Sequence, residues 1–282
     1  MTFLNIFKEK ITEPIHHENE DGLTLSDGAH ILVNCNNVVL TGSAVVLEAH
    51  NCMFFQVVGN SKIQIMDGGS IYEVGGKAKI GLIKKGSICT VHTKAQITTI
   101  NNAQIDYISG KSKIGTFNSG IIKFLDGNSK LSTMNNGTIS FVRDKAKIST
   151  MISGEITGIS NNAEVDTVMS GKIQYVLNHG YIGTLNSGEV NEICDNAEIS
   201  TQNDGNIGLM MGGSIVGQQI NGKIKVKTGN AIVLYSQQAN TEKTEKPKSQ
   251  STQKVEDKVE PVKQKKTLQK KEIEVQSIKT EE

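Results

Sequence analysis

The sequence of 282 residues contains no Trp, only 3 Pro and only 4% aromatic residues. Arg143 is its one arginine, although Lys and Arg together number 30. Base readout and bidentate phosphate contacts favour arginine, so this scarcity argues against sequence-specific nucleic-acid recognition. The formal net charge of +1 removes bulk charge as an argument for a nucleic-acid or membrane partner.

Cysteine motifs and targeting signals are also missing. The four cysteines, Cys35, Cys52, Cys89 and Cys194, form no CxxC pair and no metal-ligand cluster, so we interpret them as thiols in a reducing compartment. No apolar run approaches the ~20 residues of a transmembrane span, and the N-terminus has no secretory-signal pattern. We therefore expect a cytoplasmic or virion-associated protein. Residues 3–11 carry apolar side chains at helical spacing, which suit packing over the next domain or weak contact with a membrane surface.

What the sequence does contain is a repeat with a step of 17 residues that spans about two hundred positions. Two columns at this step hold small residues throughout. An Ile, Val or Leu follows two residues after almost every small position, and another apolar residue follows three residues later. The first column comprises Cys35, Cys52, Gly69, Gly86, Ala103, Gly120, Gly137, Gly154, Gly171, Gly188, Gly205 and Gly222. The second comprises Ala44, Ser61, Ala78, Ala95, Ser112, Ser129, Ala146, Ala163, Gly180, Ala197, Ser214 and Ala231.

Each step therefore consists of two half-units that are too short for a strand, a helix and a second strand. Spacing i, i+2 places the small and aliphatic residues on one face of a short strand, and the next step requires a bend. The turn after the longer half-unit is rich in Gly, Asn and Asp, which accept a left-handed backbone. We predict an all-β fold, a parallel β-helix or β-solenoid, right-handed, with about twelve rungs of 17 residues and a length of roughly 55 Å. Threonine, asparagine and aromatic side chains at the same step predict stacked ladders.

The pattern divides the chain into three parts. Residues 1–34 form a short N-terminal amphipathic segment and cap, because a solenoid must protect its terminal strands or use them to polymerise. Residues 35–234 form the solenoid. Residues 235–282 are rich in Lys and acidic residues and poor in apolar ones, so they are predicted to be a disordered tail.

Charge is unevenly distributed along the predicted rod. Residues 62–147 contain thirteen basic and five acidic residues, a net of +8, whereas residues 148–209 contain one basic and eight acidic residues, a net of −7. Lysines flank the second small column on one edge of the basic half. They are interpreted as ordinary solubility and edge protection, as a face for an anionic partner, or as part of complementary head-to-tail association. These residues are Lys77, Lys79, Lys94, Lys111, Lys113, Lys130, Lys145 and Lys147.

Catalytic and cofactor motifs are not found. Asp106, Asp126, Asp166 and Glu189 lie in different columns or distant rungs, unlike the clustered carboxylates of β-helix enzymes that act on polysaccharides. No phosphate-binding, dinucleotide-binding, nucleophile-elbow or zinc-ligand motif occurs. We therefore predict no catalytic residue, no metal and no cofactor.

The layout of a short N-terminal segment, an uninterrupted β-helix and a polar tail resembles bactofilins, cytoskeletal proteins whose β-helices polymerise end to end. It also resembles the solenoid shafts of phage fibres and appendages. Neither resemblance assigns a role to a residue of this chain. The leading hypothesis is a non-enzymatic structural rod that associates with itself and carries a charged face for another protein or a polyanion. The alternatives are a phage or cell-surface module for receptor or polyanion binding and, third, a polysaccharide-active β-helix enzyme.

Overall fold

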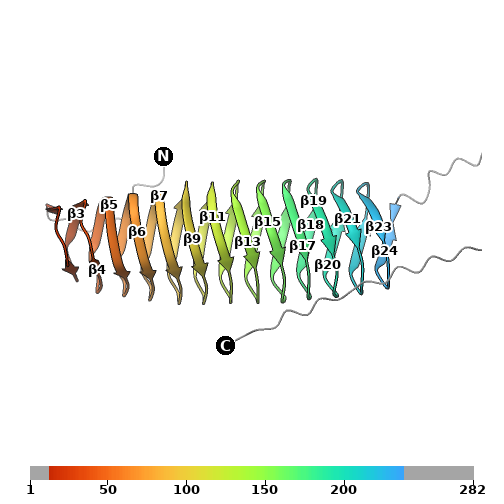
Figure 1. Cartoon of the computed structure of the whole chain (residues 1–282), viewed down its shortest axis with the longest axis horizontal. Helices are drawn as coiled ribbons and strands as arrows, with labels where there is room; N and C mark the ends of the chain where they lie inside the picture. Colours follow the sequence, from red (N-terminus) through yellow and green to blue (C-terminus); the bar gives the residue numbers. More distant parts are fainter. Residues whose placement is uncertain (1–12, 238–282) are drawn as a thin grey trace, which may run out of the picture. The chain divides into compact units, whose positions relative to one another are not determined.

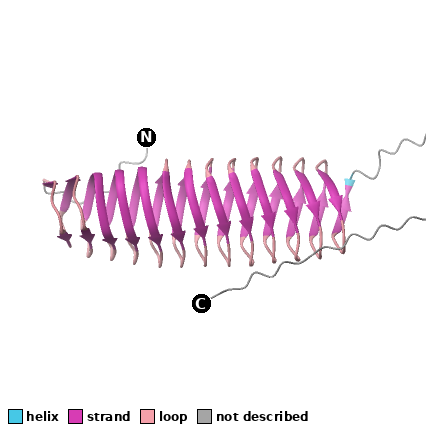
Figure 2. Ribbon diagram, viewed as in Figure 1, coloured by secondary structure: helices cyan, strands magenta, loops and turns pink. Residues whose placement is uncertain are grey.

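A computed structural model describes residues 13–237, which form a parallel β-solenoid of about thirteen turns. Figures 1 and 2 show the strands as successive turns of one coil. Every pairing joins strands of neighbouring turns in parallel. The all-β class and the rungs of 17 residues are thus confirmed, whereas the hand of the coil stays a prediction.

Two columns of strands, which we call the first and second faces, alternate along the chain. The first-face strands are β1 (Ile15–Glu18), β3 (Ala29–Val33), β8 (Gln96–Ile100), β10 (Lys113–Phe117), β12 (Lys130–Met134), β14 (Lys147–Met151), β16 (Glu164–Val168), β18 (Tyr181–Leu185), β20 (Glu198–Gln202), β22 (Ile215–Gln219) and β24 (Ile232–Ser236). The second-face strands are β2 (Thr24–Leu25), β4 (Val38–Leu40), β9 (Ala103–Ile108), β11 (Gly120–Leu125), β13 (Thr138–Val142), β15 (Glu155–Ile159), β17 (Lys172–Val176), β19 (Glu189–Ile193), β21 (Asn206–Met210) and β23 (Lys223–Lys227). Three longer strands continue through both faces and join them: β5 (Val45–Val57), β6 (Lys62–Val74) and β7 (Lys79–Val91).

The earliest turns are shorter than the rest. Ile15 pairs with His30, a step of 15 residues, and Ala29 pairs with Val45, a step of 16. From Glu48 onward the pairing follows the step of 17 almost throughout. Strands β1 and β2 therefore lie within residues 1–34, where a step of 17 detects nothing. The predicted helical segment at residues 3–11 lies outside the described residues, as do residues 238–282 of the predicted tail.

The interior is a stack of aliphatic side chains closed by the two small columns. The second small column is buried from Ala44 to Ala197, apart from Gly180, where glycine stands in place of a side chain. Its serines satisfy their hydroxyls locally, as when Ser112 Oγ donates to the Ser109 carbonyl at 2.6 Å. The burial of these aliphatic columns is the main favourable contribution to folding.

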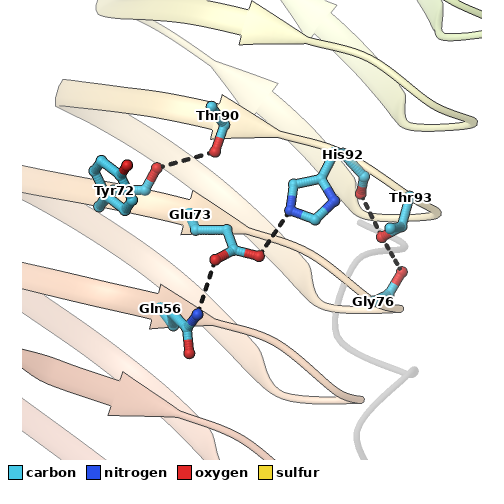
Figure 3. Close-up of polar contacts among 7 residues, drawn as sticks. All are labelled: Gln56, Tyr72, Glu73, Gly76, Thr90, His92 and Thr93. Carbon is cyan, nitrogen blue, oxygen red and sulfur yellow. Dashed lines mark hydrogen bonds and ion pairs between the residues drawn. The ribbon is translucent and has the colours of Figure 1, made fainter.

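The Gly, Asn and Asp corner adopts the predicted left-handed backbone, with φ between 46° and 73°. Thr93 occupies the same corner with φ of 62°, although it is β-branched. Its hydroxyl donates to the carbonyls of Gly76 at 3.0 Å and His92 at 2.6 Å (Figure 3). In the neighbouring turns, Glu73 accepts hydrogen bonds from Gln56 and His92 (Figure 3). Side-chain contacts between rungs thus support a strained corner.

The predicted ladders form where the columns place them. In the asparagine ladder, Asn118 donates to Asn101 at 2.8 Å and Asn135 donates to Asn118 at 2.6 Å. In the aromatic ladder, the ring centroids of Tyr107 and Phe124 lie 4.7 Å apart. Each turn is therefore tied to the next by side chains as well as by the backbone.

Candidate functional site: a lysine face and two end turns

The predicted lysines lie together on one edge of the coil, which we call the lysine face. They flank the buried small residues of the second small column on either side. In the first-face strands, Lys113 pairs with Lys130 and Lys130 pairs with Lys147. Gln96 occupies the same column between Lys79 and Lys113. The full set comprises Lys77, Lys79, Lys94, Lys111, Lys113, Lys130, Lys145 and Lys147.

Seven of these lysines are exposed, and no carboxylate of residues 13–237 forms an ion pair with them. The eighth, Lys147, is half-buried, and its Nζ lies 2.6 Å from Asp166 Oδ1 and 3.1 Å from Glu164 Oε1. The hydrogen bond to Asp166 is the largest cause that raises the pKa of Lys147. At neighbouring-strand separations of about 4.8 Å, like charges in water repel by about 1 kcal/mol per pair before salt screening. The lysine face is therefore a concentrated and largely uncompensated positive surface.

The charge of this column reverses within one rung. Lys147 pairs in register with Glu164, and the column continues through Tyr181 to Glu198. Beside it on the second face, Glu155, Lys172 and Glu189 alternate in sign. The boundary between the basic and acidic halves thus lies between β14 and β16.

The end turns carry charges of their own. Residues 13–33 contain five acidic residues and no Lys or Arg, whereas residues 210–237 contain three lysines and no acidic residue. The acidic side chains are Glu13, Glu18, Glu20, Asp21 and Asp27, and the lysines are Lys223, Lys225 and Lys227. Since all of these residues are exposed, the two ends of the described coil present opposite charges.

Each end turn also has a strand edge with no neighbour among residues 13–237. Strand β1 pairs only with β3, and β24 pairs only with β22. Apolar side chains are exposed beside these edges, with Ile15 56%, Leu234 69% and Tyr235 55% accessible. An unpaired edge of this kind is a template for pairing with another strand. Sequence reasoning missed these edges, although the bias toward acidic residues before position 34 and the Lys223, Lys225 and Lys227 triplet are visible signals.

A shallow groove of about 510 Å³ lies on the second face near the N-terminal turns. Phe55 and Tyr72 line one side of it, and their rings are stacked at 5.6 Å with an angle of 2° between planes. Because the rings face each other, they offer edges rather than faces to a ligand. Cys89 and Asp106 lie farther along the groove.

The carboxylates considered for catalysis do not converge. Asp106 Oδ1 accepts from Lys123 at 2.9 Å, and this hydrogen bond is the largest cause that lowers the pKa of Asp106. Asp126 forms a two-contact ion pair with Arg143 at 2.6 and 3.0 Å, and Asp166 is held by Lys147. In each of these three pairs, therefore, the carboxylate bonds a basic residue of an adjoining turn. Within residues 13–237 there is no group of three or more His, Cys, Asp or Glu side chains that fits a metal ion.

Comparisons with protein-family models, curated proteins and solved structures gave no match. None of the helical structure described between residues 13 and 237 has the length and apolar character of a membrane span.

Proposed function

We propose that the chain is a non-enzymatic structural rod that associates with itself end to end. The observation that carries this proposal is the pair of end turns, each with a strand edge unpaired within the described residues and with opposite charge. Backbone pairing between β1 of one copy and β24 of another extends the same parallel ladder that holds every turn within the chain.

The end turns support polar, head-to-tail stacking because the acidic turn of one copy then meets the basic turn of the next. The exposed apolar side chains at Ile232, Leu234 and Tyr235 add surface that association removes from water. Both contributions act at the same joint.

Electron microscopy and analytical ultracentrifugation of the full chain test the proposal. We expect particle lengths in multiples of the single rod at low ionic strength, with shorter particles as salt screens the end charges. Substitution of Lys223, Lys225 and Lys227 by Glu is expected to abolish the multimers, whereas the same change at the exposed Lys94, Lys111 and Lys113 leaves them intact. Single rods at low and high salt and at all protein concentrations would overturn the proposal.

A second candidate function rests on the lysine face. Its seven lysines without a carboxylate partner in residues 13–237 favour a polyanionic partner, because several neighbouring cations act together on an extended anion. Polyphosphate binding measured by isothermal titration is expected to weaken when Lys79, Lys113, Lys130 and Lys147 become Gln. Unchanged binding by this variant would remove the lysine face from consideration.

A further inference from the structure

One interior column of the first face is apolar in the middle and polar at both ends. Its register is continuous through the strand pairings from His17 to Ser236. The members between Leu32 and Leu185 are all apolar and buried. At one end the column finishes with His17, and at the other with Gln202, Gln219 and Ser236. A buried polar group is costly unless it is paired, so polar residues at these positions require an explanation.

The N-terminal end of the column is a linked pair of histidines. His17 Nε2 lies 3.2 Å from His30 Nδ1, and His17 Nδ1 lies 3.1 Å from Glu20 Oε1. His30 is 4% accessible, and its Nε2 donates to the Asp27 carbonyl at 2.7 Å. The first turn therefore presents a hydrogen-bonded polar cluster at the end of the core, directly behind the edge of β1.

The C-terminal end of the column is a series of amides and a hydroxyl. Gln219 Nε2 donates to the Gly222 carbonyl at 2.7 Å, and Ser236 Oγ donates to Gln219 Oε1 at 3.3 Å. Gln202 is completely buried, and its Oε1 has no hydrogen-bond partner in the described structure. The column thus stays polar over three successive turns up to the edge of β24.

We propose that these polar ends set the orientation and register of a head-to-tail joint, in which β1 of one copy lies on β24 of another and His17 stacks over Ser236. This inference rests on the end-to-end association proposed above and specifies its geometry. In this joint the strands stay parallel and the interior column runs from one copy into the next with polar residues meeting polar residues. A head-to-head joint would place two acidic end turns together, and like charges in contact oppose it.

A register shift of one residue is disfavoured in this joint. Such a shift turns inward residues outward because side chains alternate along a strand. Tyr235 would then enter the core column in place of Ser236 and meet the polar His17 cluster with an aromatic ring. The polar column thereby selects one register, as buried polar residues do in some other assemblies.

Cysteine cross-linking of the full chain tests orientation and register together. The background carries Cys35→Ala, because Cys35 Sγ lies 3.6 Å from the His17 carbonyl and alanine occupies the same small column at position 103. Neighbouring strands bring paired Cα atoms to about 4.8 Å, within the range that a disulfide spans. We expect the double variant His17→Cys with Ser236→Cys to form a ladder of covalent multimers with diamide, and each single variant to form none.

The controls separate this inference from the proposed function. Dimers of the single His17→Cys variant would show a head-to-head joint, and a ladder from His17→Cys with Tyr235→Cys would show a shifted register. Either result overturns the inference while end-to-end association stands. Single wild-type rods in ultracentrifugation would instead overturn the association itself.

A second variant probes the amides without changing the backbone edge. Gln219→Leu restores the residue type that the column has at Leu185, so we expect the variant to fold with an unchanged or higher melting temperature. We expect its multimers to dissociate at a protein concentration at least tenfold higher than wild type. Wild-type assembly by this variant would show that the polar column acts only within one chain.

Discussion

The first small column makes a quantitative prediction at Gly120, where the structure shows why the position is small. Gly120 has φ of 111°, and a Cβ built there meets the backbone carbonyl oxygen of Ala103 on the preceding turn. The same Cβ would lie 2.7 Å from the Ala103 nitrogen. Neither atom is the end of a flexible side chain, so substitution by alanine must separate two paired strands.

The expected cost of Gly120→Ala has two parts. Holding alanine in an unfavourable backbone region costs on the order of 1–3 kcal/mol. Forcing a methyl group against packed backbone costs about 1–3 kcal/mol more. We therefore expect a loss of about 2–6 kcal/mol in the free energy of unfolding.

Gly212→Ala is the matched control, because Gly212 has φ of 64° and its Cβ would approach no atom closer than 3.2 Å. Its cost is the left-handed backbone alone, about 1 kcal/mol after the reduced entropy of the unfolded chain is counted. Urea unfolding followed by circular dichroism measures both variants. Hydrogen exchange at β9 and β11 locates the effect, since a coil of repeated turns can open in parts. Equal losses for the two variants would refute the steric argument.

Three further predictions concern single side chains. Thr93→Asn should raise the free energy of unfolding by about 1 kcal/mol, because Asn tolerates the left-handed corner better than a β-branched residue; a lower melting temperature would show that the threonine hydroxyl contacts matter more. Lys123 holds the pKa of Asp106 below its ordinary value of 3.8, so this contribution to stability is present above that value and is lost as the pH falls through the lowered pKa. Asp106→Asn should therefore flatten the acid side of a melting-temperature profile, and an unchanged profile would contradict this. Burial, followed by a hydrogen bond with Asp195, raises the pKa of Cys194 to about 11. Iodoacetamide at pH 8 should leave Cys194 unmodified in the folded protein by peptide mass spectrometry, and rapid alkylation would contradict its burial.

The sequence predicted the central turns well because each constraint recurs at the same step. A residue such as Ile122 is buried with its counterparts in the turns before and after, so one periodic pattern specifies strand, face and register together. The same logic placed Lys113 beside Lys130 before any coordinates. The lysine face was therefore predictable as a surface, since its geometry follows from the repeat.

The end turns could not be predicted in this way. The steps of 15 and 16 residues in the first turns break the period, so Ile15 and His30 align with nothing at 17. The contact between His17 and His30 depends on that altered step. Likewise, whether Asp166 bonds Lys147 depends on side-chain reach rather than on column position. Periodicity determines which residues stack, but end geometry and cross-column contacts need the folded chain.

The placement of charge favours joining at the ends over packing side by side. Lateral association of the basic half with the acidic half requires free carboxylates opposite the lysine face. Glu164 and Asp166, the acidic residues nearest to that face, are already bonded to Lys147 within the chain. Surface ion pairs contribute only about 0–1 kcal/mol each, so exchanging an internal pair for an intermolecular one gains little. The end turns differ, because there the charges accompany an unpaired strand edge whose backbone groups gain hydrogen bonds in the joint. Salt should therefore weaken end-to-end multimers without abolishing them at high protein concentration, whereas purely charge-driven lateral pairs would disappear.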